Sequence, residues 1–159
     1  MSNRLDYSVQ SPELTKKLVE LSMAQGKASI EPSLHHLVDM RASQMNGCTF
    51  CVDMHLKQAL AGGERQLRLH HVATWRESNL FSPRERAALA YTEALTDLAP
   101  DGITDELYKT VREQFSEKEL ADLTFAIMTI NAWNRANVAF RTVPGSLDKA
   151  YGLDKVAVG

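Results

Sequence analysis

Only two of the 159 residues are cysteines, and they lie three positions apart as Cys48 and Cys51. A framework of several disulfides, as found in small secreted domains, is therefore excluded. One bridge between residues this close would enclose almost no loop and would be a poor structural staple. The pair is better explained by thiol chemistry or by metal binding.

The chain also lacks an excess of either charge, with 18 Lys and Arg against 20 Asp and Glu. It has no run of basic residues, so we expect no nucleic-acid partner. The longest apolar stretch, residues 120–133, is too polar to span a membrane, because it is interrupted by Asp122, Thr124, Thr129 and Asn131. Residues 1–13 contain no apolar segment of the kind that directs secretion. We therefore expect a cytoplasmic protein with no membrane partner.

No segment alternates apolar and polar residues over a strand's length, and no linker or internal repeat interrupts the chain. Hydrophobic residues make up 44% and charged residues 24%, which is the usual globular balance. The sequence therefore predicts one all-α domain over residues 1–159, a bundle of about seven helices. Apolar periodicity and helix-capping signals place these helices at 12–25, 32–45, 47–61, a short segment within 64–79, 83–98, 104–115 and 116–140.

Two of these helices begin with a capping box, at Ser82 and at Ser116. The helix at 116–140 is apolar over much of its circumference, so we expect it to be central in the bundle or buried against another subunit. Val143-Pro144-Gly145 ends this helix, and the tail from Tyr151 is predicted to be loosely held.

Cys48, Cys51 and His55 are the candidate chemical residues. Spacings of three and four residues place them on one face of a helix that begins at Asn46-Gly47. Positions three apart on a helix lie about 5 Å from each other, which a disulfide tolerates. A helix start also stabilises a thiolate, and His55 can accept a thiol proton. The set therefore supplies a nucleophile, a base and a second thiol.

The same three residues also fit two alternative roles. Zinc could bind Cys48, Cys51 and His55 if a fourth ligand came from one of the remaining histidines, namely His35, His36, His70 or His71. Alternatively, the cysteines are buried bystanders beside a core histidine. Either alternative makes the protein a structural or interaction module.

Further motifs give the chain a family resemblance. It resembles the alkylhydroperoxidase D-like (AhpD-like) proteins of the carboxymuconolactone decarboxylase superfamily over about residues 30–145. The matching segments are residues 41–44 (RASQ), 46–51 (NGCTFC) with His55, 75–78 (WRES), 81–82 (FS), 85–90 (ERAALA), 93–96 (EALT) and 130–135 (INAWNR).

The resemblance implies an antioxidant peroxidase or thiol–disulfide relay that reduces peroxides, organic hydroperoxides above all, and is itself reduced by an external thiol. It implies that Cys51 is the buried nucleophile near His55 and that Cys48 is the more exposed resolving thiol. No metal or organic cofactor is implied, and the subunit is expected to form a homo-oligomer (dimer, trimer or hexamer). Decarboxylases of the superfamily lack the cysteine pair, so a non-redox activity on a small lactone or acid is disfavoured.

One position departs from the family pattern. Members usually carry a relay glutamate twelve residues before the first cysteine, and here that position is His36. A histidine can relay a proton, but it cannot supply a fixed negative charge to His55. Asp39, one helical turn further on, is a candidate substitute for that charge.

The remaining candidates are expected to have structural roles. His35, His70 and His71 are predicted to be solvated or capping histidines. Arg135 is expected to pair with a carboxylate such as Glu93. Methionines are expected to fill the core, as Met23, Met40, Met45, Met54 and Met128.

Overall fold

The computed structural model describes residues 2–157, and within that range the chain consists of helices and loops without a strand. The predicted all-α, single-domain fold is confirmed, with short helices added near each end. The elements are α1 (Tyr7–Gln10), α2 (Pro12–Gln25), α3 (Pro32–Met45), α4 (Thr49–Ala61), α5 (Gln66–His71), the 3₁₀ helix η1 (Val72–Glu77), α6 (Pro83–Thr96), α7 (Asp105–Arg112), α8 (Glu117–Phe140) and α9 (Asp148–Tyr151).

Both predicted capping boxes are present. At the start of α8, Ser116 Oγ accepts the backbone N–H of Glu119, while the Glu119 carboxylate accepts the backbone N–H of Ser116. Ser82 and Glu85 make the same reciprocal pair at the start of α6. Each box satisfies two N–H groups that the helix itself leaves without partners.

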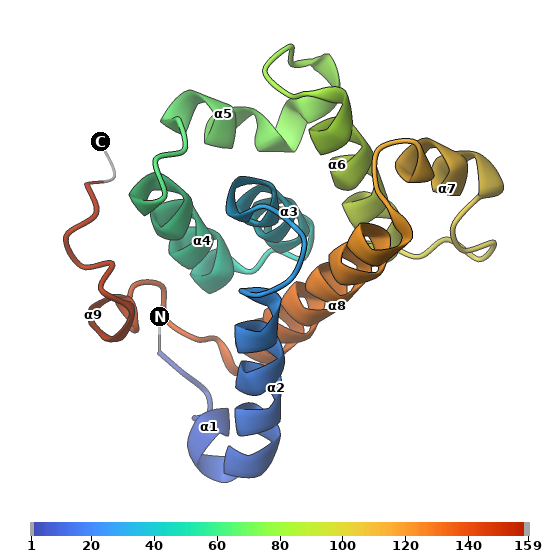
Figure 1. Cartoon of the computed structure of the whole chain (residues 1–159). Helices are drawn as coiled ribbons and strands as arrows, with labels where there is room; N and C mark the ends of the chain where they lie inside the picture. Colours follow the sequence, from blue (N-terminus) through green and yellow to red (C-terminus); the bar gives the residue numbers. More distant parts are fainter. Residues whose placement is uncertain (1, 158–159) are drawn as a thin grey trace.

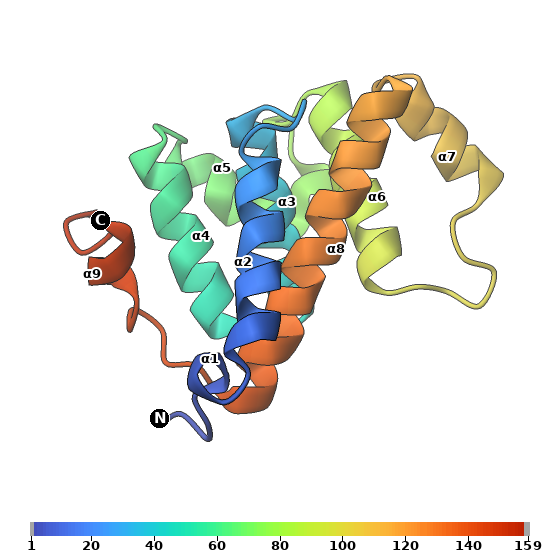
Figure 2. The same cartoon turned by 60° about the horizontal axis from the view of Figure 1, so that its bottom comes forward.

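Helix α3 lies at the centre of the molecule, surrounded by α4, α6 and α8 (Figure 1). It contributes to two hydrophobic clusters. Leu34 and Val38 pack with residues of α6, α7 and α8, and Leu37 and Met40 pack with residues of α4, α5, η1 and α6. Helix α2 runs along α8 (Figure 2). The central position of α3 brings its polar side chains close to both neighbouring helices.

Helix α8 contacts α2, α3, α4, α6 and α7, so its predicted central position is confirmed. Its outer face nevertheless exposes large apolar side chains at Phe125, Met128 and Val138. The prediction that all the methionines fill the core is therefore wrong for Met128, which is 56% exposed, and for Met23 on α2. Among the described residues, no helix is both long enough and apolar enough to cross a membrane.

Glu93 joins three elements, but not through Arg135. Its Oε1 accepts hydrogen bonds from Arg41 Nε at 2.6 Å and from Trp75 Nε1 at 2.8 Å, and Arg76 pairs with its other oxygen. Arg135 instead donates to Oδ1 of Asn131, one turn back on α8, at 2.8 Å. The expected Arg135–Glu93 pair is thus wrong, because α3 and η1 lie closer to Glu93 and supply its partners.

The C-terminal segment is anchored to α4. Lys57 Nζ lies 2.6 Å from Asp148 Oδ2 of α9 and 2.8 Å from Asp53 Oδ2 of its own helix. Beyond α9, Leu153 is only 5% exposed. The prediction of a loosely held tail from Tyr151 is therefore wrong at Leu153, because an apolar side chain there finds a surface to pack on. In Figure 1, α9 lies at the opposite edge of the molecule from α7.

A carboxylate on α8 fixes the loop before α3, and its removal should destabilise the fold in a pH-dependent way. Asp122 accepts the backbone N–H and the hydroxyl of Ser29 and pairs with Lys118. These contacts lower its pKa from 3.8 to about 2. Because the pKa is lower in the folded protein, the ionised carboxylate stabilises folding above about pH 4, and this contribution fades as the pH falls towards 2.

We expect Asp122→Asn to lower the free energy of unfolding by about 1 kcal/mol at pH 7. The difference from the parent should shrink when urea unfolding is measured at pH 3. Asp101→Asn, at an exposed position in the α6–α7 loop, is the matched control and should have little effect at either pH. A difference that stayed constant between pH 7 and pH 3 would contradict this role for Asp122.

Candidate functional site

The cysteine pair lies at the turn between α3 and α4. Gly47 has φ +64°, a left-handed conformation that glycine adopts without a steric cost. The chain then enters α4 with Cys48 as its N-cap residue, and Cys48 Sγ accepts the backbone N–H of Cys51 at 3.3 Å. The predicted end at Ala61 is confirmed, whereas the helix begins at Thr49 rather than at Gly47, because Gly47 adopts the left-handed turn conformation and Cys48 caps the helix. The sulfur of Cys48 therefore lies where helix N–H groups stabilise negative charge.

Cys48 and Cys51 form a disulfide with a Cα–Cα distance of 5.3 Å. The helical spacing thus brings the two sulfurs together, as expected. Both residues are buried, at 1% and 2% exposure. The expectation that Cys48 is the more exposed thiol is wrong, because Phe50 and Met54 pack around the pair in a small apolar cluster.

Asparagines of α8 hold this turn in place. Asn46 Nδ2 donates to Oδ1 of Asn131 and to Oδ1 of Asn134, each at 2.9 Å. Asn134 Nδ2 in turn donates to Ser43 Oγ on α3 at 3.0 Å. The three residues Ser43, Asn131 and Asn134 are buried. A satisfied buried network of this kind fixes the turn from which α4 begins.

A third asparagine of α8 faces the disulfide itself. Asn137 Nδ2 lies 3.7 Å from Cys51 Sγ, and its Oδ1 accepts the hydroxyl of Tyr7 at 3.1 Å. Asn137 was not among the residues predicted from the sequence. The sequence does contain a pattern that could have indicated it. Asparagines recur every three residues, at Asn131, Asn134 and Asn137, and residues with this spacing share one helical face.

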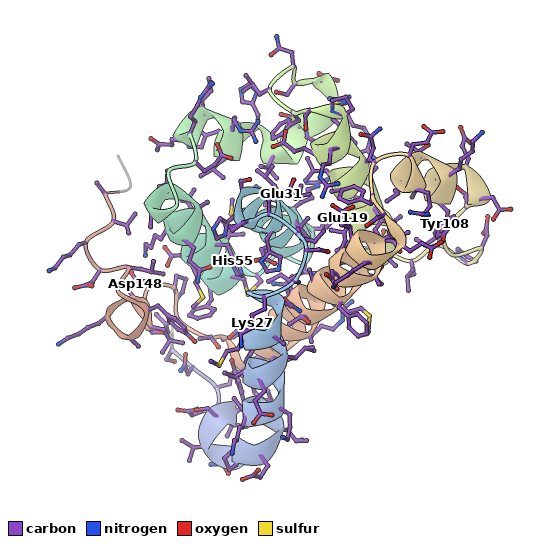
Figure 3. The ribbon with its side chains drawn as sticks, in the orientation of Figure 1. Lys27, Glu31, His55, Tyr108, Glu119 and Asp148 are labelled. Carbon is purple, nitrogen blue, oxygen red and sulfur yellow. A yellow bond between two sulfur atoms is a disulfide. The ribbon has the colours of Figure 1, made fainter. Side chains whose placement is uncertain are left out.

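His55 projects from α4 towards α3. Its Nδ1 lies 2.9 Å from Gln58 Oε1 and 3.4 Å from Asp39 Oδ2. Both partners are oxygen acceptors, so Nδ1 carries the proton of the neutral ring and Nε2 keeps the lone pair. In Figure 3, His55 points into the space between α4 and α3. His55 can therefore act as a base through Nε2 while its other nitrogen is held in place.

Asp39 is the carboxylate that the structure brings to His55. It is buried on α3, and the same Oδ2 also lies 3.7 Å from His35 Nδ1. His35 was expected to be solvated or capping, and that prediction is wrong because its ring lies beside a buried carboxylate. Gln58 was also missed, although its position three residues after His55 places both on one face of α4.

His36 lies on α3 close to these residues but has no hydrogen-bond partner for its buried Nδ1 among the described residues. Burial lowers its pKa below the ordinary value of 6.5. Asp39 opposes this shift, while His35 and His55 add to it. At pH 7 the ring of His36 is therefore neutral.

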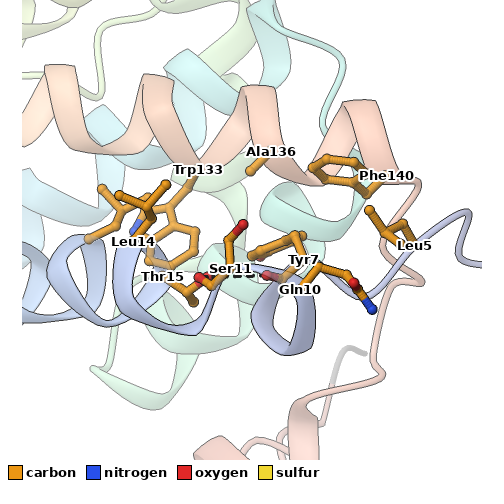
Figure 4. Close-up of a pocket in the computed structure, with 10 residues that line it drawn as sticks. Leu5, Tyr7, Gln10, Ser11, Leu14, Thr15, Trp133, Ala136 and Phe140 are labelled. Atoms are coloured by element: carbon orange, nitrogen blue, oxygen red, sulfur yellow. Dashed lines mark hydrogen bonds between the residues drawn. The ribbon is translucent and has the colours of Figure 1, made fainter.

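A cavity of about 780 Å³ connects these groups. Cys51, His55, His35, His36 and Asp39 all line it, whereas Cys48 does not. Segments from both ends of the described chain complete its wall. A smaller hollow of about 290 Å³ lies beside it between α1, α2 and α8 (Figure 4). Polar side chains of this hollow already have hydrogen-bond partners within the protein. Thr15 Oγ1, for example, donates to the backbone carbonyl of Ser11 at 2.9 Å.

Within residues 2–157, no group of three or more His, Cys, Asp or Glu side chains is arranged to hold a metal ion. Each cysteine sulfur is bonded to the other. The zinc alternative therefore has no ligand set in this arrangement. His71 hydrogen-bonds to Ser78 at 3.0 Å, and His70 is exposed.

Comparison with known proteins identifies the family. The model of the carboxymuconolactone decarboxylase family matches residues 12–94. The chain is also 38% identical to the uncharacterised protein YdfG of Bacillus subtilis (strain 168), over 87% of this chain and 95% of that protein. The chain belongs to the carboxymuconolactone decarboxylase family.

Solved structures place this family member among the AhpD-like folds. The Agrobacterium tumefaciens protein ATU0492 superposes with a TM-score of 0.87 at 37% identity, over 90% of this chain and 98% of that one. Its function is unknown, and an antioxidant defence role of the AhpD type has been suggested for it. The debrominase Bmp8 superposes with a TM-score of 0.77 at 21% identity, over 93% of this chain and 79% of that one, which shows a shared fold alone.

The titration of His36 provides a test of this geometry. Because burial lowers its pKa, we expect its ring to protonate with a midpoint below pH 6.5 in an NMR titration of the folded protein. His36→Gln assigns the signal by removing it. A midpoint above pH 6.5 would mean that the ring is solvated or paired with a carboxylate, and would contradict the buried position described above.

Proposed function

We propose that this family member is a thiol-dependent peroxidase that uses Cys48 and Cys51 as a dithiol–disulfide couple. The observation that carries the proposal is the position of Cys51, which faces the cavity beside His55 while bonded to Cys48. His55 is held through Nδ1 by Gln58 and Asp39. In this proposal Cys51 is the nucleophile and His55 the oriented base at the cavity wall, and Cys48, which is bonded to Cys51 but does not line the cavity, is the resolving thiol.

The oxidative half-reaction begins from the reduced pair. His55 Nε2 accepts the proton of the Cys51 thiol, and the thiolate attacks the outer oxygen of a hydroperoxide ROOH. The O–O bond breaks, Cys51 becomes a sulfenic acid, and the alkoxide leaves as ROH after taking the proton from His55. The Cys48 thiol then attacks the sulfenic sulfur, releasing water and forming the disulfide.

The reductive half-reaction returns the pair to the dithiol. Two equivalents of an external thiol, or one dithiol, reduce the bridge and leave as a disulfide. Attack at Cys51 is favoured, because Cys51 faces the cavity and Cys48 does not. Cys48 is then the leaving thiolate, and its N-cap position stabilises the charge it acquires. The cycle needs a compartment that holds reduced thiols.

Asp39 is assigned the role of the negative charge in this relay. It contacts His55, whereas a contact between His36 and His55 is absent from the hydrogen bonds and ion pairs of the described residues. A carboxylate beside Nδ1 stabilises the imidazolium that forms when Nε2 accepts a proton. His36, neutral at pH 7, is assigned a secondary role in proton transfer at the cavity wall.

The comparisons support this function at the level of family and fold. ATU0492, at 37% identity, has been linked to antioxidant defence of the AhpD type. The likeness to Bmp8 carries no activity to this chain, because its 21% identity reflects the fold. We also propose a homo-oligomer that covers the outer face of α8, where Phe125, Met128 and Val138 are exposed.

Thiol counting tests the redox cycle directly. We expect one equivalent of cumene hydroperoxide to remove both thiols of the reduced protein within minutes, and dithiothreitol to restore them. Cys48→Ser should stop at a Cys51 sulfenic acid that dimedone traps, and Cys51→Ser should not react. Persistence of both thiols in the parent protein would refute the peroxidase proposal.

The relay assignment is tested by comparing two α3 variants. We expect Asp39→Asn to slow peroxide-dependent oxidation about tenfold and to shift the acid limb of its pH–rate profile, and His36→Gln to have a smaller effect. His55→Gln is the reference variant, because it removes the base itself, and we expect it to lower the oxidation rate by about 10²–10⁴-fold. A larger effect of His36→Gln than of Asp39→Asn would reassign the relay to His36.

A further inference from the structure

The surroundings of Cys51 do not by themselves favour a thiolate. Its side chain is buried, and burial disfavours the charged form of a thiol. None of the described residues that line the cavity is a lysine or an arginine, whereas Asp6 and Asp39 are carboxylates. The first N–H groups of α4 face Cys48 instead, since the backbone N–H of Cys51 donates to Cys48 Sγ. The other titratable side chains of this wall are Tyr7, His35, His36, His55 and Tyr151. The thiolate of the proposed cycle therefore needs a donor besides the imidazolium of His55.

Asn137 of α8 offers such a donor. Its Nδ2 lies 3.7 Å from Cys51 Sγ and also donates to the backbone carbonyl of Trp133 at 2.9 Å. A carbonyl oxygen can only accept, so the atom that faces it is the amide nitrogen, whose second N–H is free to point at the sulfur. Asn137 is only 4% exposed, so little water competes for this N–H. A hydrogen bond from it to a thiolate is charge-assisted and stronger than one to a neutral thiol.

Tyr7 holds the other end of the Asn137 amide. Its hydroxyl donates to Asn137 Oδ1 at 3.1 Å. Burial raises the pKa of Tyr7 above its ordinary value, so the hydroxyl keeps its proton at pH 7. The ring lies between α1 and α8 (Figure 4), with its centroid 5.6 Å from that of Phe140. The segment before α1 is bonded to the end of α8, where the backbone N–H of Arg4 donates to the carbonyl of Phe140 at 2.8 Å. The N-terminal segment thus fixes the direction of the amide that faces Cys51.

We propose that Asn137 is a catalytic residue that donates a hydrogen bond to the Cys51 thiolate, and that Tyr7 is a positioning residue that orients the Asn137 amide. The proposal rests on the proposed function and adds to it the group that stabilises the negative charge before a peroxide is attacked. No bond forms or breaks at Asn137, whose N–H stays on nitrogen while the thiol proton passes to His55 Nε2. A donor that binds the thiolate more strongly than the thiol raises the fraction of Cys51 that reacts at neutral pH.

Alkylation by iodoacetamide tests this role without a peroxide. In Cys48→Ser protein, Cys51 is the remaining thiol, and its alkylation rate follows its thiolate fraction as the pH is raised. We expect Asn137→Leu to raise the pH midpoint of this rate by about 1, so that the rate well below the midpoint falls about tenfold. The plateau rate at high pH should not fall, because a less stabilised thiolate is no weaker a nucleophile. A rate that is lower at every pH with an unchanged midpoint would indicate a misplaced thiol and would overturn the proposal.

Three further variants in the same Cys48→Ser protein separate hydrogen bonding from packing. Asn137→Asp keeps the shape of the side chain but replaces the N–H donor with a negative charge, so the midpoint should rise further than in Asn137→Leu. Tyr7→Phe leaves the amide in place without its partner and should raise the midpoint by less than Asn137→Leu. Tyr91→Phe is the matched control, because it removes a hydroxyl that lies 3.0 Å from Thr124 Oγ1, and it should leave the midpoint unchanged. Equal midpoints with Asn137 and with Asn137→Asp would overturn the proposal.

The failure of this inference can be told apart from the failure of the peroxidase cycle. Alkylation midpoints that shift as expected in a protein whose thiols resist cumene hydroperoxide would support the hydrogen bond from Asn137 and refute the peroxidase. Oxidation by cumene hydroperoxide at pH 7 that is as fast in Asn137→Leu as in the parent, with an unchanged alkylation midpoint, would support the peroxidase and overturn the role of Asn137.

Discussion

The site depends on a buried hydrogen-bond network between α8 and the α3–α4 turn. The side-chain oxygens of Asn131 and Asn134 accept hydrogen bonds from the side-chain amide of Asn46. Asn134 also donates a hydrogen bond to the hydroxyl of Ser43. Loss of one partner would leave buried polar groups unpaired, at a cost of about 1–3 kcal/mol for each group. The turn therefore has one favoured conformation, and that conformation sets where α4 begins. The positions of Cys48, Cys51 and His55 follow from it.

The proposed chemistry depends on three helices that meet at this point. Helix α4 carries the disulfide and His55, α3 supplies Asp39, and α8 contributes Asn137 next to Cys51. Relative to the usual family pattern, the carboxylate has moved one turn along α3, from the position of His36 to Asp39. Positions three apart on a helix lie on the same face, so the moved carboxylate still reaches His55. In the proposed cycle, Asp39 therefore supplies the negative charge that a glutamate at the position of His36 would otherwise supply.

The surroundings of the site combine a closely packed central helix with a cavity of about 780 Å³. The central helix α3 is packed on several sides, and the Glu93 cluster ties it to α6 and η1. Segments near both ends of the described chain close the cavity in part, and they are fixed by contacts such as the Tyr7–Asn137 hydrogen bond and the Lys57–Asp148 ion pair. The shared family fold does not itself specify what the cavity binds.

The sequence alone determined the helical fold and the local part of the site. Capping boxes at Ser82 and Ser116 and the three- and four-residue spacings of Cys48, Cys51 and His55 act within one helix, where geometry follows directly from residue order. Only the tertiary structure decided the rest. It buried Cys48, paired His55 with Asp39, brought Asn137 to Cys51, and gave Glu93 to Arg41 rather than Arg135. These contacts join residues of different helices, and their partners depend on how the helices pack, which no local spacing encodes.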